Sequence, residues 1–156
     1  MEPPMRRLLF IALIVLIPLT VACRPLVNSS DTVAVIEPLA GGEFNKFFPK
    51  DDGDYDVLFT QEKAGFAQAK LNFQGNEVAT LAVTDTANAP DALAKFQDTD
   101  LEIAGYPAAA VGELGTAILV ADRFQVQVRA KDASFDAAAR EEWIEQFDLD
   151  GLAGLE

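Results

Sequence analysis

The sequence predicts an α+β fold in which an antiparallel meander sheet carries short helices, with a C-terminal helix packed on one face. Two observations predict this class. Short stretches that alternate apolar and polar residues, or are rich in β-forming residues, follow one another with brief turns between them. Near the C-terminus, Trp143, Ile144 and Phe147 instead follow the spacing of a helix. Strands joined by short turns pair antiparallel, so a following helix can cover one face of their sheet.

The first three strands are expected at 55–61, 66–73 and 78–83. In the first of them, Tyr55 and Val57 stand at alternate positions on one side, as in a strand with one buried face. The connections between these strands are short and contain glycine, which is typical of hairpins. The three strands therefore predict an antiparallel meander.

The second half of the domain predicts further strands. One is expected at 101–103, and residues 108–111 are expected to continue it past a kink. A hairpin is expected from the apolar run at 116–121, a turn at 122–123 and a strand at 124–131. This hairpin has the clearest strand pattern in the chain.

The strand expected at 124–131 alternates apolar and polar residues without interruption. Its apolar positions, such as Val126, are expected to pack on the core, and its polar positions are expected to meet water. A sheet with one wet face offers a surface to a partner. The candidate partner surface consists of the polar residues Gln125, Gln127 and Arg129.

Three short helices are expected between and after the strands. Apolar residues at helical spacing predict them at 43–48, at 91–96 and at 135–147. Ser134 is a suitable N-cap for the last helix, because its hydroxyl can accept a hydrogen bond from a free backbone N–H. The leucines that follow this helix are expected to fix the tail to the same core.

The N-terminal residues have the pattern of a secretory signal peptide. Arg6 and Arg7 precede an apolar run at 8–22, which is 15 residues long and contains Pro18. As a helix this run would span about 22 Å, whereas a bilayer core is about 30 Å thick. A charged start and a short apolar core favour a cleaved signal over a retained membrane span.

The apolar run ends in Leu19-Thr20-Val21-Ala22-Cys23, which resembles the bacterial lipobox. In that motif a Leu-like residue and two small residues precede a cysteine whose thiol receives a diacylglyceryl group. Thr20 departs from the motif, because leucine is usual at its position. Cys23 is the one cysteine of the chain and falls where the signal must be cut, so it is the expected lipidation site. The alternative is an ordinary signal peptide with an incidental cysteine.

Three parts of the chain follow from these patterns. Residues 1–22 are the expected signal peptide, residues 23–31 are the lipidated cysteine and a linker, and residues 32–156 are a single α+β domain. Two acyl chains hold a protein stably at a membrane, whereas one holds it only marginally. The expected location is therefore the cell envelope, with the domain outside the cytoplasm.

Charge and composition exclude several classes of function. The chain has 25 acidic and 12 basic residues; residues 23–156 lose Glu2, Arg6 and Arg7 and so keep 24 and 10, a formal net charge of −14. Such a surface repels phosphate backbones, which excludes nucleic acid as a partner. The chain has no histidine, which excludes Ser-His-Asp triads, Cys-His pairs and histidine-ligated metals. No glycine-rich phosphate loop is present and no cofactor is expected.

The densest acidic stretch, at 51–56, raises the question of a metal site. Asp52, Asp54 and Asp56 have the spacing of the first three ligands of a calcium loop. The pattern then fails, because Val57 and Lys63 stand where an EF-hand needs glycine and a bidentate glutamate. A solvated turn before a strand is the preferred interpretation, and the three aspartates remain weak candidates for metal ligands.

Several motifs of the domain together carry a resemblance to a known family. They are FNKFFP at 44–49, TQEKAGFAQAKL at 60–71, AGYPA at 104–108, ADRFQVQVR at 121–129 and FDLDGL at 147–152. With these motifs the chain resembles a family of small uncharacterised cyanobacterial lipoproteins over most of residues 43–152. The resemblance implies attachment to a membrane facing the periplasm or the thylakoid lumen, but the motifs carry no chemistry that assigns an activity.

These observations lead to three hypotheses about function. The first is a non-catalytic accessory lipoprotein that is held at a membrane by lipid and binds another membrane, periplasmic or lumenal protein. The second is a binding protein for a small apolar ligand or lipid between the sheet and the helices. The third is a hydrolase that uses paired carboxylates, ranked last because so many acidic residues make chance pairs common.

Overall fold

The computed structural model describes residues 36–155, except for the side chain of Asn88. The expected signal peptide, Cys23 and the linker lie outside the described residues, as do residues 32–35 of the expected domain. Within residues 36–155 no helix is both long enough and apolar enough to span a membrane.

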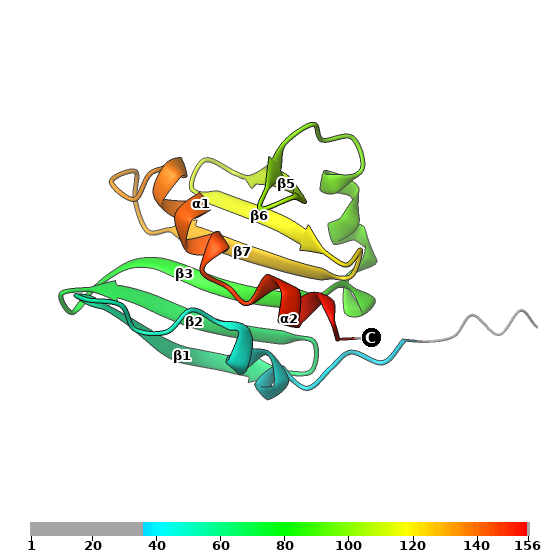
Figure 1. Cartoon of the computed structure of the whole chain (residues 1–156), viewed down its shortest axis with the longest axis horizontal. Helices are drawn as coiled ribbons and strands as arrows, with labels where there is room; N and C mark the ends of the chain where they lie inside the picture. The colour runs from blue at the N-terminus through cyan, green and yellow to red at the C-terminus, as the bar shows by residue number, and fades with distance from the viewer. Residues whose placement is uncertain (1–35, 156) are drawn as a thin grey trace, which may run out of the picture. The chain divides into compact units, whose positions relative to one another are not determined.

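Seven strands form one antiparallel sheet, so the predicted α+β class with a meander sheet is confirmed (Figure 1). Two meanders make up the sheet, β1-β2-β3 and β4-β5-β6-β7, and they join where β3 pairs with β7, giving the order β1-β2-β3-β7-β6-β5-β4. The strands are β1 (Tyr55–Lys63), β2 (Phe66–Phe73), β3 (Asn76–Asp85), β4 (Glu102–Ile103), β5 (Tyr106–Val111), β6 (Gly115–Val120) and β7 (Phe124–Ala130).

Helices lie on both faces of the sheet, whereas the sequence predicted them on one. On the first face, here called the inner face, the C-terminal helices lie over β6 and β7 and η1 lies over β2 (Figure 1). On the other face, η3 packs against β5 and β6 through a separate small apolar cluster around Phe96 and Leu119. The helices are η1 (Gly41–Phe47), η2 (Thr86–Asn88), η3 (Pro90–Phe96), α1 (Ala137–Glu145) and α2 (Leu149–Ala153), the η elements being 3-10 helices.

The main core lies between the inner face and its helices. Val126 is at its centre, because it is completely buried and pairs with Val83 on one side and Ile118 on the other. Helix α1 contributes Trp143 and Ile144, which are both buried, so the predicted helical stripe does face the core. Core burial of this kind is the main favourable contribution to folding.

The C-terminal helix is shorter than predicted and has a different cap. It begins at Ala137, and the carboxylate of Asp136 accepts the hydrogen bond from the backbone N–H of Ala139. Ser134, the predicted cap, instead donates its backbone N–H to Asp132 in the preceding turn at 2.9 Å. Both residue types are good N-caps, and the hydrogen bond to Asp132 holds Ser134 in the turn at 132–134 instead.

The residues at 108–111 do not continue the strand at 101–103, as predicted, but turn back along it. Ala104 and Gly105 have φ values of +53° and +80°, which is the backbone of a tight two-residue hairpin turn. Ile103 therefore pairs with Tyr106, and the two short strands lie antiparallel. The chain therefore reverses at Ala104 and Gly105, just before Tyr106 and Pro107, where the sequence predicted only a kink.

Candidate functional site

The sheet face opposite α1 and α2 is open over β2, β3 and the later part of β7, where none of the helices in residues 36–155 covers it (Figure 1). Its side chains alternate along each strand with those of the buried inner face. We call this surface the open face; the strand register places on it Gln68, Lys70, Thr80, Ala82, Thr84, Gln127 and Arg129, all of them half-buried or exposed.

The three predicted partner residues differ in their exposure. Arg129 is exposed and Gln127 is half-buried, but Gln125 is only 7% exposed, so its predicted exposure was wrong. The cause is η3, from which the Lys95 ammonium donates a 2.6 Å hydrogen bond to the side-chain amide oxygen of Gln125. Gln125 in turn donates to the side chain of Gln127 at 3.1 Å. Gln125 therefore holds η3 against the sheet, and the accessible surface begins at Gln127.

Basic residues gather on the open face, although the chain as a whole has a formal net charge of −13. Lys70, Thr80 and Arg129 lie in one row across β2, β3 and β7, because Thr80 pairs with both of the others. Adjacent strands are about 4.8 Å apart, so the two cations lie roughly 10 Å apart. At the edges of this surface, Lys63 lies over the ring of Phe66, and burial lowers the pKa of the Lys95 ammonium on η3.

The two cations of this row differ in their local partners. Lys70 forms a 2.6 Å salt bridge with Glu77, and the hydrogen bond from Lys70 lowers the pKa of that carboxyl group. The Arg129 side chain makes no hydrogen bond or ion pair with the described residues. A guanidinium has five N–H donors arranged in a fork that suits a carboxylate. Arg129 is thus the cation of the open face that is most available to a partner.

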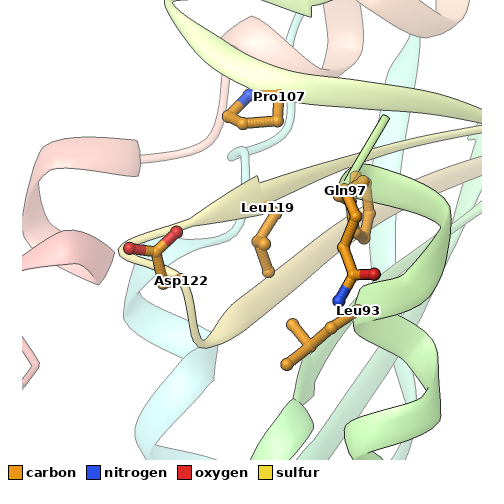
Figure 2. Close-up of a pocket in the computed structure, with 6 residues that line it drawn as sticks. Leu93, Gln97, Pro107, Leu119 and Asp122 are labelled. Carbon is orange, nitrogen blue, oxygen red and sulfur yellow. The ribbon is translucent and has the colours of Figure 1, made fainter. Parts of the chain in front are cut away.

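A small cavity lies on the far side of η3, between that helix and the ends of β5 and β6. Figure 2 shows the apolar Leu93 and Leu119 near its centre, with the polar ends of Gln97 and Asp122 on opposite sides. Its volume is about 230 Å³, below the roughly 300–1,000 Å³ of typical ligand pockets. It lies where the second hypothesis places a ligand, but it has room for a short apolar group rather than for a lipid.

The three aspartates considered for calcium do not form a ligand set. Asp52 pairs its backbone with Tyr55, and the Asp54 carboxylate accepts a 3.0 Å hydrogen bond from Gln74. No group of three histidine, cysteine, aspartate or glutamate side chains in residues 36–155 could hold a metal ion. Asp52 and Asp54 therefore lie in the turn before β1, and Asp56 is the second residue of that strand.

A buried ion pair that the sequence did not predict joins the ends of β3 and β7. Asp85 is completely buried, and its carboxylate accepts hydrogen bonds from Arg123 at 3.0 and 2.8 Å. The backbone N–H groups of Leu39 and Ala87 donate the other two, at 3.1 and 3.0 Å. Arg123 also donates to the carbonyl of Glu37 at 3.2 Å. The pair therefore fastens the beginning of the domain to the end of the sheet.

The sequence contained one signal for this pair. Leu81, Val83 and Asp85 stand at alternate positions of β3, so the strand period places the carboxylate on the buried face. A buried charge needs a partner, and Arg123, which the sequence analysis placed in a turn, supplies it from 38 residues away. With four hydrogen bonds the carboxylate has no acceptor position left for a substrate.

Local hydrogen bonds lower the pKa of three carboxyl groups, those of Glu77, Asp85 and Asp132. Hydrogen bonds from Lys70 lower the pKa of Glu77, and those from Ser134 lower the pKa of Asp132. Burial alone would raise the pKa of Asp85, but the hydrogen bonds from Arg123 and the backbone outweigh it and lower that pKa. A general acid in glycoside hydrolysis needs a raised pKa, so these three carboxyl groups do not suit that role.

No protein-family model matches this chain, and neither a curated protein nor a solved structure matches it.

Proposed function

We propose that this chain is an extracytoplasmic lipoprotein, anchored at Cys23, whose domain is a non-catalytic accessory module that binds another protein through the open face. The resemblance to cyanobacterial lipoproteins suggests a periplasmic or lumenal side of the membrane. The partner is a membrane, periplasmic or lumenal protein that presents carboxylates to the row formed by Lys70 and Arg129.

The anchoring part of this proposal rests on the N-terminal pattern. A charged start and a short apolar run precede the chain's one cysteine, and the residues before that cysteine resemble a lipobox. The acidic domain offers no cluster of basic residues in sequence that would bind anionic lipid by itself. Attachment through lipid is the route that this composition favours.

The single observation that carries the binding part is Arg129, which has no side-chain partner within residues 36–155 and lies in a basic row on an otherwise acidic domain. Complementary charge steers association and selects partners, and arginine is enriched at the centres of protein interfaces. The small residue Thr80 separates the two cations of the open face, and Ala82 lies in the next row between Gln68 and Gln127. Such a surface suits contact with a protein better than enclosure of a small molecule.

Reversing the charge of Arg129 tests the binding surface. In a pull-down from detergent-solubilised membranes, Arg129→Glu should reduce recovery of the partner about tenfold, equivalent to ~1.4 kcal/mol, because it sets like charges against each other. Lys50→Glu is the matched control, since Lys50 is exposed in the loop between η1 and β1, away from the open face. Both variants should melt within a few degrees of the wild-type domain, because surface changes usually cost about 0.5 kcal/mol or less.

Two results of this pull-down would refute the binding surface. Equal recovery with Arg129→Glu and the wild type would show that the partner binds elsewhere. Equal losses with Arg129→Glu and Lys50→Glu would show that only the total charge matters. The small-ligand alternative predicts instead that native mass spectrometry of the purified domain finds a bound apolar molecule.

A further inference from the structure

The outer backbone edge of β1 is hydrogen-bonded at the start of the strand, but farther along it has no hydrogen-bond partner within residues 36–155. Asp52 and Tyr55 exchange two backbone hydrogen bonds, at 3.1 and 2.9 Å, across this edge. The Asp51 carboxylate then accepts the backbone N–H of Val57 at 2.8 Å. These contacts satisfy the outward backbone groups of the first part of the strand, in the way that natural sheets protect an edge from pairing.

The next outward groups of β1 belong to Phe59 and Glu62. Backbone groups of an edge strand point outward at every second residue, so Phe59 follows Val57. A bulge between Phe59 and Gln61 adds one residue, and Lys63 pairs inward with Phe66 to close the hairpin, so Glu62 is the next outward position. Within residues 36–155, no backbone hydrogen bond on the outer side of this stretch is recorded. A short length of edge is therefore unpaired.

Apolar side chains flank this unpaired edge on both faces of the sheet. Leu58 is 51% exposed on one face and Phe59 is 42% exposed on the other. Phe59 packs edge-on against Phe48 at 5.1 Å between ring centroids, and both rings line a cavity of about 280 Å³ beside the strand. A strand added at this edge would place one of its side chains next to Phe59, in that cavity.

The charges around the edge indicate what kind of segment it can receive. Four aspartates, at 51, 52, 54 and 56, are exposed at the start of β1, and they outnumber the two lysines that line the cavity, Lys46 and Lys50. A second copy of this chain has the wrong charge, because each chain carries a formal net charge of −13. Pairing two copies through their unpaired stretches would also set Glu62 against Phe59 at both ends. A basic segment from another protein meets neither obstacle.

We propose that the outer edge of β1, from Leu58 to Glu62, receives an extended segment of another protein by strand addition. The segment has an apolar side chain at its centre, which contacts Phe59, and basic residues at the end that lies beside the aspartates at 51–56. Main-chain hydrogen bonds to Phe59 and Glu62 provide the pairing, and the cavity and the aspartates provide the selectivity. This surface is distinct from the open face.

The variants Glu62→Pro and Glu62→Ala test this proposal as a matched pair. Both remove the same side chain, and with it the 2.6 Å hydrogen bond that Asn45 on η1 donates to the Glu62 carboxylate. Only proline also removes the outward N–H, and proline is tolerated on an edge strand. The probes are two synthetic peptides with the same alternating valine and threonine core, one ending in two lysines and the other in two glutamates. Binding is measured by fluorescence anisotropy, and folding of each variant by its melting temperature.

The lysine peptide should bind the wild type and Glu62→Ala alike, and Glu62→Pro about tenfold more weakly. The glutamate peptide should bind the wild type no more tightly than the lysine peptide binds Glu62→Pro. Hydrogen exchange should slow at the amides of Phe59 and Glu62 when the lysine peptide is present. Arg129→Glu should leave this binding unchanged, which separates it from the open face. The proposal is overturned if the wild type binds neither peptide or binds both equally, or if folded Glu62→Pro binds as well as Glu62→Ala.

Discussion

Replacing Val126 with aspartate should unfold the domain or destabilise it by several kcal/mol. Val126 is completely buried between Val83 and Ile118, and neither of these neighbours can pair with a charge. A carboxylate placed there without a partner either loses its hydration or stays protonated, and both are costly. The measurement is urea denaturation of the purified domain, followed by circular dichroism.

Gln127→Asp is the control, because it introduces the same charge one residue along the same strand. Gln127 lies on the open face and accepts a hydrogen bond from Gln125, a role that an aspartate can keep. Its cost should therefore be about 0.5 kcal/mol. Similar losses from the two variants would show that both faces of β7 are closed at this point, and the open face would not exist there.

Arg123→Ala should cost about 3–5 kcal/mol, because it leaves the buried carboxylate of Asp85 without its cation. It also removes the hydrogen bond that ties Glu37 to the end of the sheet. Arg129→Ala is the control, since Arg129 is exposed on β7, the strand that Arg123 precedes, and has no side-chain partner among the described residues. That variant should change stability by about 0.5 kcal/mol or less.

The pH dependence of the Arg123→Ala effect follows from the pKa of Asp85. Burial opposes ionisation of Asp85, but the hydrogen bonds from Arg123 and the backbone keep its pKa below the ordinary value. The pair therefore stabilises the wild type above the unfolded pKa of about 3.9, and this contribution is lost as the pH falls through the lower folded-state pKa. In the variant, protonation relieves the unpaired buried charge. The difference in stability between the two proteins should thus shrink below about pH 4; a difference that is constant with pH would contradict the ion-pair account.

The alternation of apolar and polar residues correctly predicted which side chains of a strand share a face of the sheet. The alternation in β7 correctly placed Val126 inside and Arg129 outside, because a strand side chain can face only two ways. The same rule misplaced Gln125, since it says which face a residue occupies but not whether another element covers that face. Here η3, which comes from about 30 residues earlier in the chain, docks on it through Lys95.

The other misses also depend on contacts between distant residues or on backbone angles. The ion pair of Asp85 and Arg123 joins the ends of two strands that become neighbours only when the two meanders meet at β3 and β7. The reversal between β4 and β5 depends on positive φ at Ala104 as well as Gly105, and alanine gives little warning of such a backbone. The basic row on the open face could be recognised only once β2, β3 and β7 were known to be adjacent.

The most direct test of the account is the state of Cys23 in the mature protein. Mass spectrometry of the N-terminal peptide from isolated membranes should find Cys23 as the first residue, with a diacylglyceryl group on its thiol. Cys23→Ser should abolish this modification and leave uncleaved precursor or soluble protein, because the domain has no other means of holding the membrane in this account. A mature chain that begins elsewhere, or a Cys23→Ser variant that still partitions fully into the detergent phase with lipid-anchored proteins, would contradict the lipoprotein assignment.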